Sequence, residues 1–151
     1  MLSMRAKYAL RALVYLAKTK DQGPILIGDI AESQKLPRKF LEQILLELKN
    51  LRVLKSRQGK GGGHFLAKDP EQILVGLIVR VFNGPLALVP CVSVTAFEKC
   101  EECVDFAHCG IRRVMQKVRD VTADILDGTT LKTLVAIEAS ESDEASLMYF
   151  I

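Results

Sequence analysis

The sequence lacks any hydrophobic run that could cross a lipid bilayer. Its longest uninterrupted apolar run extends from Ile73 to Val79 and stops at Arg80, whereas a membrane-spanning helix needs about 20 apolar residues. Residues 1–20 alternate cations with apolar residues, and they lack the hydrophobic region and small-residue cleavage site of a secretory signal peptide. These absences argue against a spanning helix, and we expect a cytoplasmic protein with no membrane partner.

Sequence motifs of common enzyme classes are absent as well. The segment Gly59-Lys60-Gly61-Gly62-Gly63 lacks the Gly-Lys-Ser/Thr ending of a phosphate-binding loop and does not open a helix after a strand. The segment Cys100-Glu101-Glu102-Cys103 has the spacing of a redox pair, but the strand-turn-helix context of a thiol oxidoreductase does not surround it. We therefore expect that the protein is not an enzyme.

Charge is distributed unevenly along the 151 residues, a length that suffices for one domain with a small extension. The net charge is +3, but residues 1–80 contain fifteen lysines and arginines against seven acidic residues. Residues 81–151 contain six against eleven. The amino-terminal part therefore has the charge expected of a surface that binds a polyanion such as DNA.

This basic part is typical of a helix-turn-helix protein. Helical periodicity predicts helices over residues 4–19 and 28–33, and a third that begins at Pro37, a residue favoured in the first turn. Apolar residues of the third helix recur at steps of three and four toward the core: Leu41, Ile44, Leu45, Leu48 and Leu51. The opposite face carries Arg38, Lys39, Glu42 and Gln43. These side chains can contact phosphates and base edges as a recognition helix does.

A glycine-rich basic hairpin follows the third helix directly. Short strands are predicted at residues 53–56 and 64–67, and four glycines in the five positions 59–63 permit a tight tip between them. Arg57 and Lys60 place cations where a wing can reach a phosphate or a groove. This order of elements predicts a DNA-binding winged helix. Beside the four recognition-helix residues, its predicted DNA contacts are Arg5, Lys7, Tyr8, Arg57, Lys60, Gly61, Gly62, Gly63 and His64.

The remainder of the chain is predicted to be helical apart from one long loop. Asp69 and Pro70 are typical of a helix cap and a first-turn proline, and a buried helix is expected over residues 73–83. A long helix over residues 111–127 has a stripe at alternating steps of four and three, formed by Ile111, Met115, Val118, Thr122 and Ile125. The stripe favours a homodimer seam, because a small winged domain leaves little core for it to cover. A last helix is expected over residues 130–138, before an acidic-polar flexible tail and an apolar end at 148–151.

All the cysteines lie in the loop, within nineteen residues: Cys91, Cys100, Cys103 and Cys109. Stable disulfides are not expected in a reducing cytosol, so this grouping predicts an iron-sulfur centre, a zinc site or metal-free redox-sensitive thiols. Structural zinc usually takes two C-x2-C knuckles, and only Cys100 and Cys103 form one. An iron-sulfur centre tolerates longer, uneven spacings, so the pattern favours it while the other two interpretations stay open.

Several motifs resemble those of the Rrf-type winged-helix regulators over residues 1–135. They are Met4-Arg5, Tyr8-Ala9, Phe40-Leu41-Glu42-Gln43-Ile44, Gly61-Gly62-Gly63, Pro90-Cys91-Val92-Ser93 and Cys109-Gly110-Ile111-Arg112. The resemblance implies a homodimer on an imperfect DNA palindrome, with the third helix in the major groove and the wing tip toward the minor groove. In cluster-binding members three loop cysteines hold a [2Fe-2S] or [4Fe-4S] centre, and the matching residues here are Cys91, Cys103 and Cys109. Cys100 is an additional thiol, a candidate for the fourth ligand or for the place of Cys103.

The expected fold is mainly α with a small β-hairpin: a winged helix-turn-helix domain at residues 1–84, a sensor loop at 85–110, long dimerisation helices at 111–138 and a tail at 139–151. The expected function is a homodimeric transcription regulator that binds double-stranded DNA. It would sense redox state, iron, nitric oxide or cluster status through a [2Fe-2S] or [4Fe-4S] centre. The alternatives are a metal-free repressor of cysteine or sulfur metabolism, controlled by its thiols or by a protein partner, and a structural-zinc protein.

Overall fold

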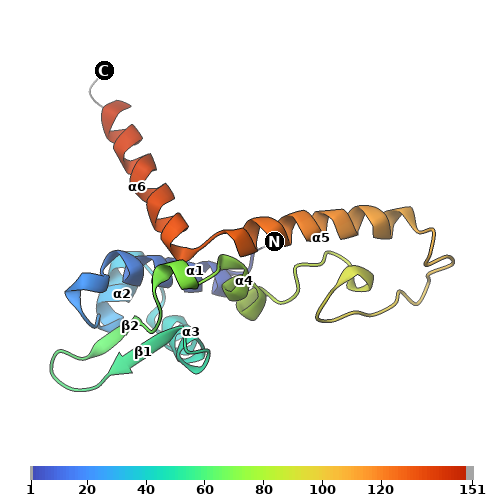
Figure 1. Ribbon diagram of the computed structural model, residues 1–151. Helices are drawn as coiled ribbons and strands as arrows, with labels where there is room; N and C mark the ends of the chain where they lie inside the picture. Colours follow the sequence, from blue (N-terminus) through green and yellow to red (C-terminus); the bar gives the residue numbers. More distant parts are fainter. Residues whose placement is uncertain (1, 149–151) are drawn as a thin grey trace.

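The computed structural model describes residues 2–148. Figure 1 shows a globular unit from which a long arm, formed by residues 84–128, extends. The helices are α1 (Met4–Lys18), α2 (Ile27–Gln34), α3 (Arg38–Asn50), α4 (Val75–Asn83), α5 (Gly110–Gly128) and α6 (Leu131–Met148). The strands are β1 (Leu54–Arg57) and β2 (Gly63–Leu66), and short 3-10 helices are η1 (Lys20–Gln22), η2 (Pro70–Gln72) and η3 (Pro90–Val92). This mainly helical architecture with one antiparallel hairpin confirms the predicted fold class.

The helix α1 is the centre of the globular unit. It packs against α2, α3, α4, α6 and β2, and small side chains such as Ala6, Ala9 and Ala12 are fully buried at these contacts. Its first turn is capped by Ser3, whose Oγ accepts from the Ala6 N–H at 3.1 Å. The same hydroxyl donates to the Phe82 carbonyl at 3.0 Å, so the start of α1 is joined to the end of α4.

The helix α3 has the predicted amphipathic pattern with one exception. Leu41, Ile44, Leu45 and Leu48 are buried in the core. Leu51, predicted to join them, is 39% exposed. The helix ends at Asn50, and the chain then reverses at Arg52, whose φ of 56° is left-handed. Because Leu51 lies in this turn rather than in the helix, its periodic position no longer faces the core.

The hairpin pairs β1 with β2 in the register Leu54–Leu66 to Arg57–Gly63. A single residue from the segment before α2 adds to its far side, which the sequence did not indicate. Ile25 and His64 exchange two backbone hydrogen bonds, of 2.9 and 2.7 Å. Gly63 has a φ of 145°, and a Cβ there would lie 2.4 Å from the Ile25 carbonyl oxygen. This close backbone approach requires glycine, and β1 is left as the free edge of the sheet.

The segment predicted as one helix from Ile73 is divided. Asp69 caps the separate η2, accepting from the Glu71 N–H, and α4 begins only at Val75. Ile73 and Leu74 are extended because they pair with the turn between α5 and α6: the Leu131 N–H donates to the Ile73 carbonyl at 2.8 Å. The Val75 N–H donates to the Thr129 carbonyl at 2.9 Å. The start of α4 is thus fixed to the junction of the two carboxy-terminal helices.

The helix α6 packs on the globular unit rather than extending from α5. Leu131 is buried in the core, and Lys18 Nζ lies 2.6 Å from Glu138 Oε2. The helical backbone continues to Met148, ten residues beyond the predicted end at Glu138, so the segment 139–148 that was expected to be a flexible tail is helical. The apolar end of the chain, residues 149–151, lies outside the described residues. Within residues 2–148, no helix combines the length and the apolar composition that crossing a bilayer requires.

The contact between Gly63 and Ile25 predicts an effect on stability. Gly63→Ala should lower the free energy of unfolding by about 1–3 kcal/mol, because the new Cβ meets backbone atoms and the φ is unfavourable for alanine. The matched control is Gly28→Ala in α2, where a Cβ meets no atom within 4 Å; it should be neutral or stabilising by up to about 1 kcal/mol. Urea unfolding followed by circular dichroism measures both, and equal stability of the two variants would contradict the prediction.

Candidate nucleic-acid interface and cysteine site

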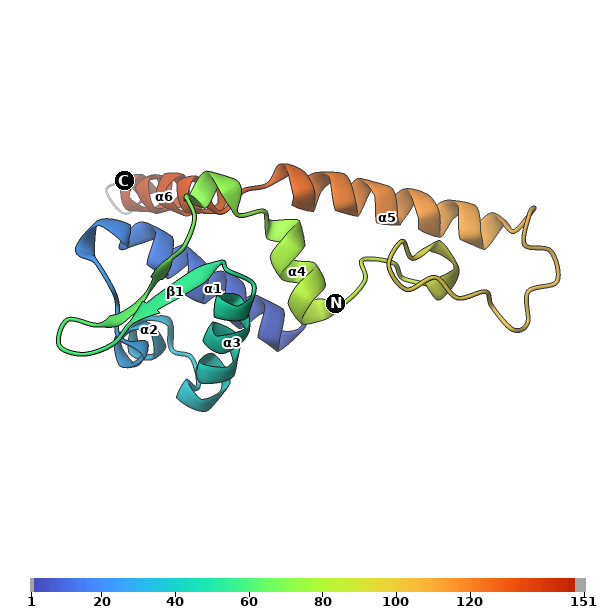
Figure 2. The ribbon, with the colours of Figure 1, turned by 60° about the horizontal axis from the view of Figure 1, so that its bottom comes forward.

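The exposed face of α3 and the hairpin lie on the same side of the globular unit (Figure 2). Arg38, Lys39, Glu42 and Gln43 are all exposed on this face, as predicted. Arg38 Nε lies 3.4 Å from Glu42 Oε1, one turn along the helix. An exposed pair of this kind contributes little stability, so both side chains can rearrange toward a ligand at small cost.

The tip of the wing contains exposed cations, and the packing of the hairpin explains why two of its positions are glycine. Lys60 is exposed, and the Arg57 guanidinium donates to the Gly61 carbonyl at 3.0 Å. Gly62 is buried, and a Cβ there would lie within 3 Å of the Arg57 and Gly59 carbonyl oxygens. Gly62 and Gly63 are therefore explained by the packing of the hairpin, while Arg57 and Lys60 supply the charge at its tip.

The first-helix residues have different surroundings. Arg5 pairs with Glu47 of α3, and its guanidinium lies 5.8 Å from the centroid of the Phe82 ring. Tyr8 is half-buried against the core, whereas Lys7 is exposed. Arg5 and Tyr8 thus have partners that join α1 to its neighbours, and Lys7 alone of the three is free of the core.

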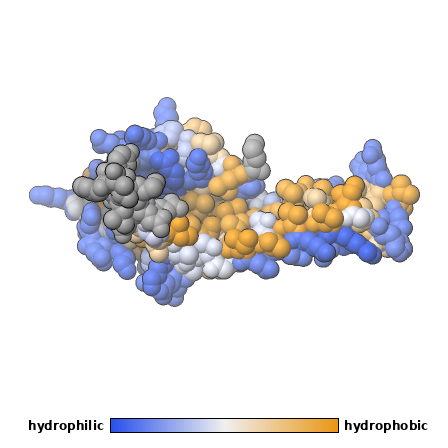
Figure 3. All heavy atoms as spheres, turned by 90° about the horizontal axis from the view of Figure 1, so that it is seen from above, coloured by the Kyte–Doolittle hydropathy of each residue, from blue (hydrophilic) through white to orange (hydrophobic). Residues whose placement is uncertain are grey.

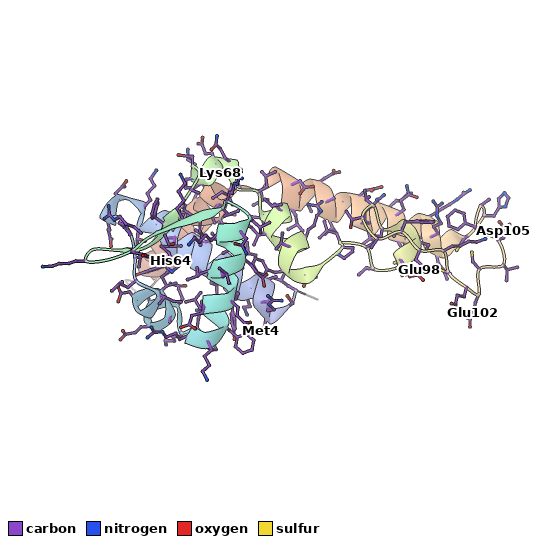
Figure 4. All side chains as sticks on the ribbon, turned by 90° about the horizontal axis from the view of Figure 1, so that it is seen from below. Met4, His64, Lys68, Glu98, Glu102 and Asp105 are labelled. Atoms are coloured by element: carbon purple, nitrogen blue, oxygen red, sulfur yellow. The ribbon has the colours of Figure 1, made fainter. Side chains whose placement is uncertain are left out.

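His64 lies between the wing and α3 rather than at the tip (Figure 4). It borders a cavity of about 380 Å³ together with Glu42 and Lys49 of α3, and its Nδ1 is buried without a hydrogen-bond partner among the described residues. Burial, and then the charge of Lys49, lower the pKa of His64 below its ordinary value. Both effects disfavour the charged imidazole beside α3.

The four cysteines line one cavity of about 400 Å³ at the outer end of the arm. Cys91 is buried in η3, Cys100 is exposed, and Cys103 and Cys109 are half-buried. Backbone hydrogen bonds bring the separate segments together: the Glu98 N–H donates to the Pro90 carbonyl at 3.4 Å, which closes the loop between Cys91 and Cys100. The Cys103 N–H donates to the Cys100 carbonyl at 3.2 Å, forming the turn of the C-x2-C pair.

Two of these thiols have further interactions. Burial raises the pKa of the Cys91 thiol, and a side-chain hydrogen bond with Cys100 raises it further. Cys109 is the N-cap of α5, where its Sγ accepts from the Arg112 N–H at 3.4 Å. One cysteine thus lies beside a second thiol, and another forms part of the long helix.

Charged side chains complete the wall of this cavity, and one of them, Arg112, stacks on an aromatic pair. The Arg112 guanidinium lies 4.3 Å from the centroid of the Phe106 ring, and Phe106 meets Phe97 edge to face at 6.2 Å. The sequence did not indicate this stacking, because a lone aromatic in a loop has no periodic signal. Asp105 Oδ2 holds His108 Nδ1 at 2.8 Å, and hydrogen bonds from His108 lower the pKa of Asp105. His108 is thereby engaged by a carboxylate.

The four thiols that line this cavity are a donor set suited to an iron-sulfur cluster. Among the described residues, no three cysteine, histidine or acidic side chains meet closely enough to hold one ion. A tetrahedral zinc site would need its sulfurs within about 2.3 Å of one point. The ligands of a cluster bind different irons and are spread around it, which agrees with thiols that line one cavity without meeting at its centre.

The helix α5 presents an apolar stripe to solvent. None of its residues, all of which the structure describes, is buried. Figure 3 shows apolar side chains gathered along the arm. The most exposed ones follow steps of three and four: Ile111, Val114, Val118, Val121 and Ile125, between 40% and 70% exposed. The predicted stripe shared Ile111, Val118 and Ile125, but Met115 and Thr122 are half-buried, so Val114 and Val121 replace them.

These features define the class of protein. A recognition-type helix beside a glycine-rich wing, on a compact helical core, is the arrangement of a winged-helix transcription regulator. A family model described as Rrf2, iron-dependent transcriptional regulator, matches residues 2–137. The chain belongs to the Rrf2 family.

Known relatives agree with this family over nearly the whole chain. A putative HTH-type, rrf2-like transcriptional regulator of Rhodobacter capsulatus is 37% identical over 139 residues, 90% of this chain and 93% of the relative. The solved structure of CymR, the global cysteine regulator of B. subtilis, has a TM-score of 0.76 at 31% identity and covers 91% of this chain and 97% of its own. The structure of T. potens IscR has a TM-score of 0.74 at 29% identity, covering 94% and 90%. The predicted family, fold and non-enzymatic class are confirmed.

The lowered pKa of the half-buried His64 predicts a pH dependence of stability. Its pKa is lowered from 6.5 in the folded chain, so the unfolded chain binds more protons as the pH falls below about 6.5. The free energy of unfolding should therefore be constant above this pH and decrease from about pH 6.5 toward pH 5. His64→Gln should reduce this decrease.

The control is Ser56→Ala, at the position that pairs with His64 across the hairpin. It should leave the pH dependence as in the wild type. Urea titrations at several pH values measure all three proteins, and an unchanged slope in His64→Gln would show that His64 is not the titrating group.

Proposed function

We propose that the protein is a homodimeric transcription regulator that binds a palindromic site in duplex DNA and responds to the state of its cysteine loop. The observation that carries the DNA-binding part is the exposed polar face of α3 beside the cationic wing tip. Glu42 and Gln43 are the proposed base-reading residues, because glutamine pairs with adenine and glutamate accepts from cytosine. Arg38, Lys39, Lys7, Arg57 and Lys60 are the proposed phosphate or groove contacts.

The proposed dimer forms through α5. Its exposed stripe repeats at steps of three and four over the length of the helix, the spacing of a helix–helix seam. A contiguous exposed apolar surface of this kind usually marks an interaction site. Pairing two copies along α5 would place two recognition helices at a set separation, as a palindromic site requires.

For the sensor, we propose that the loop cysteines hold a [2Fe-2S] or [4Fe-4S] centre. The thiols that line one cavity support this assignment, as does the family description as iron-dependent. Cys91, Cys103 and Cys109 are the proposed ligands by family position, and Cys100 is the fourth candidate. When bound, such a centre supplies redox and ligand-exchange chemistry.

The chain offers a direct path from this loop to the DNA-binding face. Cys109 is both a proposed ligand and the N-cap of α5, so ligation holds the loop against the start of that helix. At its other end, Asp127 forms two hydrogen bonds with Arg80 of α4, at 2.6 and 2.8 Å. We infer that loss of ligation would relax α5 and change the spacing of the two recognition helices. A useful coupling is about 1–3 kcal/mol, or roughly five- to 150-fold in affinity.

A second candidate is a metal-free thiol switch. It is favoured by the hydrogen bond between Cys91 and Cys100 and by the structural similarity to a regulator described as the global cysteine regulator. In that case a protein partner or oxidation of the loop thiols would control DNA binding.

The assigned DNA contacts predict two distinct phenotypes on a site selected from random duplex DNA. Gln43→Ala should mainly relax base preference, with a loss of about 1–3 kcal/mol for the preferred site alone. Arg57→Ala should weaken binding to all sequences and reduce the slope of log affinity against log salt by about one. Titrations on preferred and mutated sites over a range of salt measure both, and exchanged phenotypes would overturn the assignment.

The proposed iron-sulfur centre predicts the visible absorption of the protein, its iron and sulfide content and the reactivity of its thiols. Protein purified without oxygen should absorb between roughly 300 and 600 nm and contain matching iron and acid-labile sulfide. Cys100 is exposed, so alkylation followed by mass spectrometry should modify it rapidly in a three-cysteine site and leave it protected in a four-cysteine site. Holo and apo protein should bind the selected site with different affinity at fixed salt.

The outcomes separate the candidates. Colourless, metal-free protein with reactive thiols after attempted reconstitution would support the thiol switch, and stoichiometric zinc would support a structural site. Equal affinities of holo and apo protein would refute the switching role even where a cluster is present.

A further inference from the structure

A basic groove lies beside the proposed reading face, at the base of the wing. Its volume is about 470 Å³, and four cations line it: Lys49, Arg52, Lys55 and Lys68. All four are exposed, and no acidic side chain lies among the residues that line the groove. This cluster is separate from the wing-tip cations Arg57 and Lys60.

Three segments of the chain bring these cations together. Lys49 belongs to the last turn of α3, and Arg52 follows in the left-handed turn that leads into β1. Lys55 lies on β1, the free edge of the sheet, opposite Phe65 of β2. Lys68 follows β2. Because the four positions have no common period, sequence patterning does not reveal them as one site.

Several other cations of the globular unit have an acidic partner. Lys18 pairs with Glu138, Lys132 with Glu71, and Arg5 with Glu47. None of the four groove cations takes part in an ion pair within the part of the chain that the structure describes. Like charges held close together without counter-charges favour an external anion.

The groove continues into the face that α3 presents. Lys49 and Ser56 line it, and they also line the neighbouring cavity that contains Glu42 and His64. In Figure 4, seen from below, Lys68 lies near the end of α3 that leads into β1, and His64 lies on β2 beside the helix. A continuous track therefore runs from a proposed base-reading residue to the four cations.

We propose that this groove binds the phosphate backbone of duplex DNA beyond the bases that α3 reads, so that the DNA footprint extends past the base of the wing. The inference rests on the proposed DNA binding and adds a contact surface to it. The phosphates of duplex DNA form a regular row of negative charges, which suits a groove lined by several cations and no acidic side chain. Contacts with the DNA backbone of this kind fix the position of the protein on the duplex without reading the base sequence. The half-buried Phe65 forms an apolar wall between the charges.

The test needs no knowledge of the operator, because phosphate contacts are independent of sequence. The holo protein and the variant Lys55→Gln/Lys68→Gln are titrated with a mixed-sequence duplex of about 30 base pairs between about 50 and 200 mM salt. The matched control is Lys20→Gln/Lys132→Gln, which removes the same charge from exposed positions outside the groove and outside α5. Thermal unfolding verifies that all three proteins are folded.

Two lost phosphate contacts should reduce the slope of log affinity against log salt by about 1.8, since each contact contributes about 0.9. The ratio of the wild-type affinity for DNA to that of the groove variant should therefore fall about twelvefold between 50 and 200 mM salt. The control pair should keep the wild-type slope. The preference of the groove variant for a selected site over the mixed duplex should also be unchanged, because the groove reads no bases.

Each other outcome overturns the proposal in a recognisable way. A wild-type slope in the groove variant would remove the groove from the interface while DNA binding stands. An equal reduction in the control pair would assign the effect to net charge. A wild type that binds no duplex even at low salt would refute the proposed function together with the groove.

Discussion

The pairing between the start of α4 and the turn after α5 is the constraint on which the arrangement of this protein depends. Backbone hydrogen bonds from Val75 to Thr129 and from Leu131 to Ile73 hold these two points together. The chain between them must therefore leave the globular unit after α4, run outward through the cysteine loop and return along α5 (Figure 1). This single junction sets where the arm begins, and it delivers α6 to its place against α1.

Side-chain contacts next to this junction also fix α5 to α4. Arg80 and Asp127 add a two-fold hydrogen-bonded ion pair next to it, and the guanidinium lowers the pKa of the carboxyl group. Gly76 lies directly beneath this pair, where a Cβ would collide with the Asp127 carboxylate. Asp127 and Arg80 thus join α5 to α4, and the contact between Phe82 and Ser3 joins α4 to the central helix. The cysteine loop and the DNA-facing surface are far apart, but rigid elements connect them.

Charge on the globular unit divides into structural and unpaired groups. Arg5 and Lys18 have acidic partners that fasten helices to one another. The cations around the wing have no such partners among the described residues, and they lie beside the exposed face of α3. Unpaired cations on one face raise the local potential for a polyanion, and the four groove cations line one cavity that no acidic side chain lines.

The helices of the globular unit, the hairpin and the family could be predicted from the order of the residues, because a period of 3.6 residues and a glycine-rich turn are local signals that survive any tertiary arrangement. The other features depend on contacts between distant parts of the chain. Leu51 had the right period but lies beyond the end of its helix, and Ile73 is extended because its backbone pairs with a segment nearly sixty residues away. Met115 has the period predicted for the stripe on α5 but is half-buried, whereas the neighbouring Val114 is 55% exposed. Burial depends on contacts between residues distant in sequence, and periodicity along one chain carries no record of it. The four loop thiols lie within nineteen residues, so their grouping was visible in the sequence, whereas the cavity that they line belongs to the folded loop.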